Sequence, residues 1–182
     1  MKVLLDTCVL FPTVMREVLL GVAARGLYTP LWSARILEEW ARAARKLGPE
    51  GEAQARGEIA LLRAAWPKAE VTWKPSVEAR LWLPDVNDRH VLAAAIAGSA
   101  DVLVTMNASD FPRNILAEEG VSRADPDAFL MGVWQSDPGT VQTACDQVLD
   151  TARRLSGADW HMRPLLKKAR LPRLAKALST QG

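Results

Sequence analysis

The chain has 182 residues, of which 49% are hydrophobic and 24% charged, and its formal net charge at pH 7 is +2. This size and apolar content suit one globular domain with an ordinary core. No apolar run approaches the roughly 18 residues of a membrane span, and Asp6 interrupts the apolar start too early for a signal peptide. Two cysteines, Cys8 and Cys145, are too few for a disulfide scaffold or a zinc site, so we expect a cytoplasmic protein.

Charge is unevenly distributed along the chain. The segment from Thr151 to Gly182 contains eight Lys or Arg residues and one acid, Asp159, which gives +7. Because the whole chain carries +2, the remaining 150 residues carry −5. An acidic body can hold a metal ion and a basic tail can contact a phosphate backbone, although a charge run by itself more often forms a solvated helix surface.

The first predicted element is a buried strand over residues 2–5, which ends at Asp6. In a parallel sheet the carboxyl ends of the strands face the ligand crevice, so Asp6 can belong to a site there. It can equally cap the helix that follows. That helix is predicted over residues 13–25, with Pro12 in its first turn and Gly26 after its end.

Two neighbouring acids are separated by the helix predicted from Ser33 to about Leu47. At about 100° per residue, Glu38 falls opposite the apolar face of this helix, whereas Glu39 falls on its flank. We therefore expect Glu38 in solvent and Glu39 within reach of the crevice. The elements around this helix are a strand or extended link at 27–31, a helix at 50–65, an edge strand at 70–73 and a short helix from Pro75 towards Leu83.

A helix that leads directly into a buried strand is predicted between Val86 and Phe111. Asp88 lies at the head of the apolar stripe of this helix, so its carboxylate aims along the core face. The alternative is a first-turn acid that only interacts with the helix dipole. Gly98 ends the helix, and the strand at 102–104 is too apolar to be covered on one face only.

Polar residues follow that strand, in the position where a parallel sheet keeps its ligand crevice. They are Thr105, Asn107 and Asp110. Asp101 precedes the strand, so it belongs to the opposite edge of the sheet and receives a surface role. A short helix at 114–119 and three helices at 127–134, 140–155 and 164–178 complete the chain.

Strands that alternate with helices predict an α/β fold with a parallel sheet of four or five strands and right-handed crossovers. A boundary near Ser122 separates an α/β body, residues 1–122, from a helical extension, residues 123–182, that is basic at its end. The extension is too small to fold alone. The sequence therefore predicts a single domain over residues 1–182.

The acids predict a site for a hard cation. Asp6, Glu39, Asp88 and Asp110 converge on the crevice, and Asn107 adds an amide oxygen. Oxygen-only ligands favour Mg²⁺ or Mn²⁺, which can activate a water and stabilise the charge that develops on a phosphate in transfer. Without such an ion the carboxylates would repel one another and raise each other's pKa.

Other chemistries have little support in the sequence. There is no glycine-rich dinucleotide or phosphate loop and no Gly-x-Ser-x-Gly elbow. Neither His90 nor His161 has a partner for histidine-based RNA cleavage, and we expect His90 to pack on the central helix. Cys8 is a lone thiol, which more often belongs to the core.

Four sequence blocks resemble the successive motifs of the PIN-domain ribonucleases. They are LLDT at 4–7, ILEEW at 36–40, DRHVLAAA at 88–95 and VTMNASDF at 104–111. Their order and spacing both agree with the family, and the resemblance is closest to bacterial VapC-type toxins. It implies a three-layer α/β/α fold with a five-stranded parallel sheet, Mg²⁺ or Mn²⁺ as cofactor, and endonucleolytic cleavage of RNA. The helical extension lies outside the resemblance.

The resemblance also assigns roles to individual residues. It places the family's first acid on Asp6, its helix glutamate on Glu39 and its third acid on Asp88. Asn107 occupies the usual position of the fourth acid in many toxins. Asp110 is therefore expected to replace the fourth acid. The consequence would be weaker binding of a metal ion at the second metal position.

The predicted function is that of a metal-dependent endoribonuclease, the toxin of a toxin–antitoxin pair. Asp6, Asp88 and Asp110 would hold the metal, with Glu39 as a further ligand or a water-orienting base and Thr105 and Asn107 as secondary site residues. Lys167, Lys168 and Arg170 are RNA-contact candidates, with a solvated surface or an antitoxin-docking face as the alternatives.

Other functions and partners stay open. The chain can be a housekeeping RNA-processing nuclease, or a PIN-like module that has lost catalysis and binds RNA or protein. The expected partners are RNA, an antitoxin protein and a second copy of the chain. No association with a membrane is expected.

Overall fold

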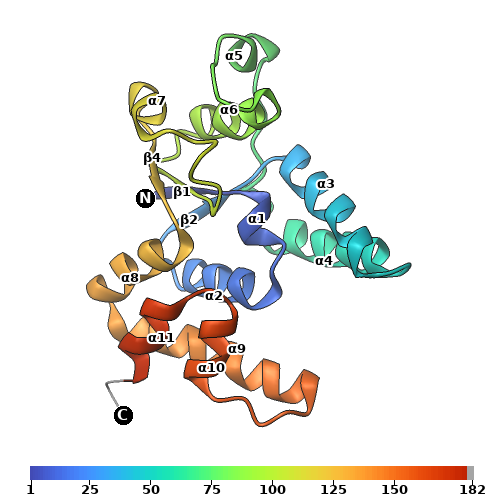
Figure 1. Cartoon of the computed structure of the whole chain (residues 1–182), viewed down its shortest axis with the longest axis vertical. Helices are drawn as coiled ribbons and strands as arrows, with labels where there is room; N and C mark the ends of the chain where they lie inside the picture. Colours follow the sequence, from blue (N-terminus) through green and yellow to red (C-terminus); the bar gives the residue numbers. More distant parts are fainter. Residues whose placement is uncertain (180–182) are drawn as a thin grey trace. The chain divides into compact units, whose positions relative to one another are not determined.

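A computed structural model describes residues 1–179, which contain eleven α-helices and a four-stranded parallel sheet (Figure 1). The chain forms two compact units. The first consists of residues 1–11 and 29–124, and the second of residues 12–28 and the chain from residue 125 onward. The α/β class and the four-stranded parallel sheet confirm the predicted fold. The predicted single-domain organisation stays a prediction.

The sheet belongs to the first unit and has the strand order β2-β1-β3-β4. Its strands are β1 (Lys2–Leu5), β2 (Thr29–Leu31), β3 (Val102–Val104) and β4 (Ser122–Ala124). β1 lies between β2 and β3, and Val3, Leu4 and Leu5 are fully buried. Backbone bonds continue the ladder past the strands, from Asp6 N to Val104 O and from Thr105 N to Ala124 O. The residues after β1 and β3 therefore emerge at the same edge of the sheet.

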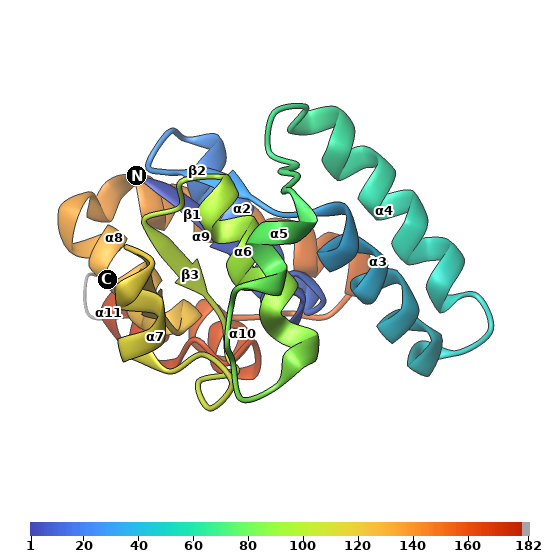
Figure 2. The same ribbon diagram turned by 90° about the horizontal axis from the view of Figure 1, so that it is seen from above.

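The helices of the first unit begin and end where local chemistry requires. The Ser33 hydroxyl accepts a hydrogen bond from Ile36 N, which caps α3 as expected. A Cβ on Gly98, where α6 ends, would meet Leu31 and Val71. Figures 1 and 2 both show α3 and α4 side by side. The helices of the first unit are α1 (Thr7–Leu10), α3 (Ala34–Ala43), η1 (Ala44–Leu47), α4 (Gly51–Ala65), α5 (Pro75–Ala79), η2 (Val86–Asp88), α6 (Arg89–Ala97) and α7 (Arg113–Glu118).

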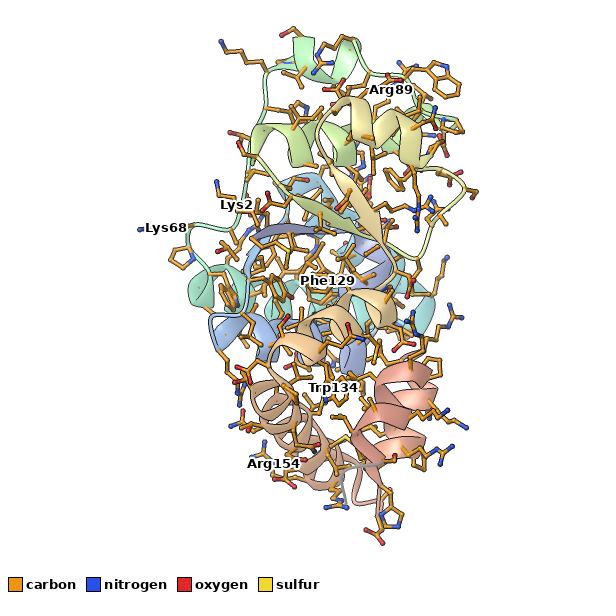
Figure 3. The ribbon with its side chains drawn as sticks, turned by 90° about the vertical axis from the view of Figure 1, so that its left-hand side faces the viewer. Lys2, Lys68, Arg89, Phe129, Trp134 and Arg154 are labelled. Carbon is orange, nitrogen blue, oxygen red and sulfur yellow. The ribbon has the colours of Figure 1, made fainter. Side chains whose placement is uncertain are left out.

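The second unit is helical. Its elements are α2 (Thr13–Ala24), α8 (Pro126–Ser136), α9 (Pro138–Ser156), α10 (Met162–Lys168) and α11 (Pro172–Ser179). Phe129, labelled with Trp134 in Figure 3, meets Tyr28 edge to face at 5.1 Å. The buried Asp127 carboxylate accepts hydrogen bonds from the backbone of Arg173 and Leu174, so α8 supplies the cap of α11.

Several elements differ from the sequence-based expectation. The predicted edge strand at 70–73 is wrong, because only one bridge, between Trp32 and Glu70, forms there. The helix predicted at 164–178 is two helices, broken where Arg170 adopts a φ of 61° before Pro172. The short helix α1 and the strand β4 were not predicted. Within residues 1–179, no helix has both the length and the apolar character that crossing a membrane requires.

Candidate active site

Asp6 is held between β1 and α1 and is only 7% exposed. Its Oδ1 accepts a 2.7 Å hydrogen bond from Thr7 N, which caps α1. Its Oδ2 accepts a 2.7 Å hydrogen bond from Thr105 Oγ1 and a 3.3 Å contact from Cys8 Sγ. Burial raises the pKa of Asp6 above its ordinary value, although the hydrogen bonds from Thr105, Cys8 and Thr7 oppose the rise. Both roles weighed for Asp6, helix cap and residue at the crevice edge, are therefore compatible.

Thr105 and Cys8 form a polar cluster around the Asp6 carboxylate. Thr105 Oγ1 lies 3.4 Å from Cys8 Sγ and also accepts a hydrogen bond from Asn107 N at 3.0 Å. Cys8 Sγ accepts a 3.2 Å hydrogen bond from Met106 N. Burial, and then the Asp6 charge, raise the pKa of Cys8 to about 12, so the thiol is not an activated nucleophile.

Glu39 lies on the flank of α3 and contacts α1 and α6 as well as Arg35 of its own helix. Its Oε2 accepts a 3.1 Å hydrogen bond from Thr7 Oγ1, while its Oε1 lies 2.9 Å from His90 Nε2 and 3.6 Å from Arg35 Nε. Burial raises the pKa of Glu39, but His90, Thr7 and Arg35 together outweigh it, and the net pKa lies below the ordinary value. Glu39 is therefore ionised at neutral pH while its side chain stays 38% exposed.

Thr7 and His90 are contacts that sequence reasoning did not find. Thr7 links two acids, because its amide donates to Asp6 and its hydroxyl to Glu39. His90 is fully buried on α6 as expected, and its ring stacks on Trp73. The contact of its Nε2 with Glu39 is short but lacks full hydrogen-bond alignment. The expectation that His90 lacks a partner for histidine-based RNA cleavage stays a prediction, and α3 brings the Glu39 carboxylate to the start of α6, where it contacts Nε2.

Asp88 lies between η2 and α6, one residue before Arg89 (Figure 3). The Asp85 side chain accepts the 2.8 Å hydrogen bond from Asn87 N that caps η2, so the Asp88 carboxylate does not cap it. Burial and then repulsion from Asp6, Asp85 and Asp110 raise the pKa of Asp88 to about 6. Carboxylates from three separate segments of the chain therefore act on one another here.

The loop after β3 carries Asn107 and Asp110. Asn107 Nδ2 donates a short hydrogen bond to Asp110 Oδ2, and Ser109 Oγ donates to Asn107 Oδ1 at 3.3 Å. Arg123 on β4 donates from one guanidinium nitrogen to Ala108 O and, at 2.7 Å, to Phe111 O. The strand that sequence reasoning missed thus fixes the loop that holds the fourth acid.

Other residues weighed from the sequence lie elsewhere. Glu38 points away from these acids towards Arg56 and Arg42, which lower its pKa to about 2, and its side chain is 37% exposed, about as much as that of Glu39. Asp101 accepts a hydrogen bond from Lys2 N at the opposite end of the strands. Lys167, Lys168 and Arg170 are exposed in the second unit, where Lys168 lies 5.1 Å from the Trp160 ring centre.

The donor chemistry of these acids fits a hard cation, although the side chains are not arranged as a metal cage. As they stand, no group of three or more His, Cys, Asp or Glu side chains within residues 1–179 could hold a metal ion. The neighbouring charges that raise the pKa of Asp88 are all carboxylates, with only His90 opposing them. A divalent cation would relieve this repulsion, and carboxylate oxygens are the ligands that Mg²⁺ and Mn²⁺ prefer.

Comparison with known proteins gives one match. A family model described as PIN domain matches residues 2–109. The match begins with β1, includes Asp6, Glu39 and Asp88, and ends one residue before Asp110. No significant match was found among the curated proteins or among the solved structures.

Proposed function

The chain belongs to the PIN-domain family, whose members are generally nucleases, and from this premise we propose that it is a metal-dependent endoribonuclease. The observation that carries the proposal is the repulsion of Asp88 by Asp6 and Asp110, which come from two other segments of the chain. Such repulsion is costly unless a cation binds among the carboxylates.

Asp6, Asp88 and Asp110 are the proposed ligands of Mg²⁺ or Mn²⁺. When bound, this ion supplies a polarised water and stabilises the negative charge that develops on the phosphate. Asp6 is held in place by Thr7 and Thr105, whereas Asp88 and Asp110 are partly exposed and can change rotamer to meet an ion. Thr105 and Asn107 support these carboxylates rather than bind metal, since each is hydrogen-bonded within the cluster.

Glu39 is the proposed water-orienting base. It is ionised at neutral pH, so it can accept a hydrogen bond from the attacking water. Thr7 holds it at a fixed place relative to Asp6, and His90 and Arg35 hold its other oxygen. These contacts position the carboxylate before substrate binds.

The test is cleavage of a mixed RNA pool by the purified full chain with Mn²⁺, then with excess chelator. The expected result is cleavage that the chelator stops. Glu39→Gln should lower the rate by about 10²–10⁴-fold, as loss of a general base does. The matched control Glu38→Gln, one residue away on α3 but paired with Arg42 and Arg56, should cleave at the wild-type rate. Cleavage that persists in chelator, or an active Glu39→Gln variant, would overturn the proposal.

We further propose that the nuclease acts in the cytoplasm as the toxin of a toxin–antitoxin pair. The motif resemblance to VapC-type toxins supports this, as does the basic surface of α10 and α11 in the second unit, which suits RNA or an antitoxin. Induced expression should arrest bacterial growth, and Asp6→Asn should abolish the arrest. Normal growth with an active nuclease would favour a housekeeping role in RNA processing instead.

A second candidate function is an RNA-binding module without catalysis. It is favoured by Asn107, an amide at the position of the fourth acid, whose side chain engages Asp110. This candidate predicts RNA binding with neither Mn²⁺-dependent cleavage nor a change in melting temperature on Mn²⁺ addition.

A further inference from the structure

The segment that leads into Asp88 presents one exposed indole. Trp82 is 60% exposed. The chain has seven tryptophans, all within residues 1–179, and the other six are buried or half-buried. Trp32 and Trp40, by contrast, are at most 2% exposed. A large aromatic side chain left in water by a folded protein indicates a contact surface more often than an isolated small apolar residue does.

The backbone around Trp82 fixes the outward direction of its ring. Leu81 and Leu83 on either side are 5% and 3% exposed, so both neighbours are anchored in the core. In an extended segment, consecutive side chains point to opposite sides, so the indole must face away from the core. Arg80, which precedes the segment, is held by a two-pronged ion pair with Glu119 at 2.5 and 2.7 Å.

The same segment is tied to the proposed catalytic residues at its other end. Asp85 caps η2, which ends at Asp88, and its charge raises the pKa of Asp88. Arg35 donates to Asn87 O at 3.4 Å and lies 3.6 Å from Glu39. Since three residues of chain span at most about 11 Å and six at most about 22 Å, Trp82 lies within about 11 Å of Asp85 and about 22 Å of Asp88. Val86, the residue after Asp85, is also 58% exposed.

We propose that Trp82 is a stacking platform for an unpaired nucleobase of the RNA substrate, in the segment that leads from α5 to η2 and Asp88. This inference rests on the proposed endoribonuclease function and adds a substrate-binding residue outside the acidic cluster. Bases within a duplex are already stacked on both faces, so only an unpaired base can offer its ring to the indole. Stacking tolerates any base, so Trp82 confers strand preference rather than sequence preference.

The size of the surface favours a base over a protein. Trp82, Pro84 and Val86 are the exposed apolar residues of this segment, and they are too few for a stable protein interface, which buries about 800 Å² per partner. One indole face does match the area of one base. The two neighbouring positions are buried leucines, so the apolar surface of this segment does not extend to them.

The test is binding of a fluorescein-labelled single-stranded oligoribonucleotide to the full chain without divalent ions, followed by anisotropy. Trp82→Ala should weaken binding about tenfold or more, and Trp82→Phe should restore most of it. The control Leu61→Ala removes an apolar side chain that is 73% exposed on α4 and should bind as wild type. The same oligonucleotide in a duplex should bind Trp82→Ala and wild type equally.

An abasic scan separates stacking from a structural role. Removal of the base at one position of the oligonucleotide should weaken its binding to wild type but leave its binding to Trp82→Ala unchanged. A residue with a merely structural role would not produce this difference between the two proteins. Equal binding of Trp82→Ala and wild type, or no binding of RNA by wild type, would overturn the platform. Wild-type binding that depends on Trp82, without any Mn²⁺-dependent cleavage, would instead overturn the proposed nuclease and keep the platform.

Discussion

The Thr105 hydroxyl donates a 2.7 Å hydrogen bond to Asp6 Oδ2, although 99 positions separate the two residues in the chain. Each residue directly follows a strand, and β1 and β3 are neighbours in the sheet, so parallel pairing alone brings them to one edge. Both side chains are buried. A buried carboxylate keeps one orientation only while its donors remain, so the Asp6 orientation depends on Thr105.

Thr105→Val should therefore weaken the fold as well as the site. The change keeps the shape of the side chain but removes the donor to a buried carboxylate, a loss of about 1–3 kcal/mol. Chemical denaturation should show this loss, and RNA cleavage should fall with it. Thr105→Ser restores the hydroxyl and should recover most of both. A Thr105→Val protein as stable as wild type would show that the bond contributes little.

Asp6→Asn should separate stability from activity. Because burial raises the pKa of Asp6, the folded chain holds this proton more tightly than the unfolded chain, so ionisation of Asp6 costs stability as pH rises above 3.8. At pH 7 the neutral variant should melt at the wild-type temperature or higher, and the difference should shrink as the pH falls towards 4. Cleavage should be lost at every pH. A large drop in melting temperature at pH 7 would contradict this.

The pH dependence of cleavage should follow Asp88. Its pKa of about 6 means that the carboxylate is protonated at lower pH and cannot bind a cation. The rate should therefore rise through about pH 6 and level off above it. Raising the Mn²⁺ concentration should move the midpoint to lower pH, because metal and proton compete for the same oxygens. If the midpoint pH does not change with the Mn²⁺ concentration, the titrating group is not Asp88.

Mn²⁺ should stabilise the folded chain even without RNA. A ligand that binds only the folded state adds about 2.7 kcal/mol at 100 times its dissociation constant. The melting temperature should rise with Mn²⁺, return with chelator and stay constant in Asp88→Asn. Asp101→Asn removes an acid from the opposite end of the strands and should respond as wild type. The same rise in Asp88→Asn would place the ion elsewhere.

Patterns of apolar and polar residues were sufficient to predict the α/β class, the central strands and the two sides of α3. Glu39 does reach Thr7 and His90, and Glu38 does point away from them, although its contacts with Arg42 and Arg56 leave it no more exposed than Glu39. Such predictions succeed because burial of one helix face depends only on residues close in sequence. The contact of His90 with Glu39 could not be predicted this way, since it depends on how α3 and α6 lie in space.

Strand pairing was the other feature that the local sequence did not predict correctly. β4 has the sequence Ser122-Arg123-Ala124, without the apolar run that signals a buried strand, and it pairs only because β3 offers an open edge. The opposite error occurred at residues 70–73, where apolar and β-branched residues suggested a strand and a single bridge forms. In both cases strand pairing was decided by a distant neighbour rather than by local sequence.

Arg123 should matter more for cleavage than its surface position suggests. Its guanidinium donates to Ala108 O and Phe111 O and so holds the loop that carries Asp110. Arg123→Met keeps the length of the side chain and removes both bonds, which should lower the cleavage rate and weaken the apparent affinity for Mn²⁺. Arg113→Met, at an exposed position on α7, controls for the lost charge and should behave as wild type. If Arg123→Met binds Mn²⁺ and cleaves RNA normally, the loop is positioned by Asn107 and Asp110 themselves.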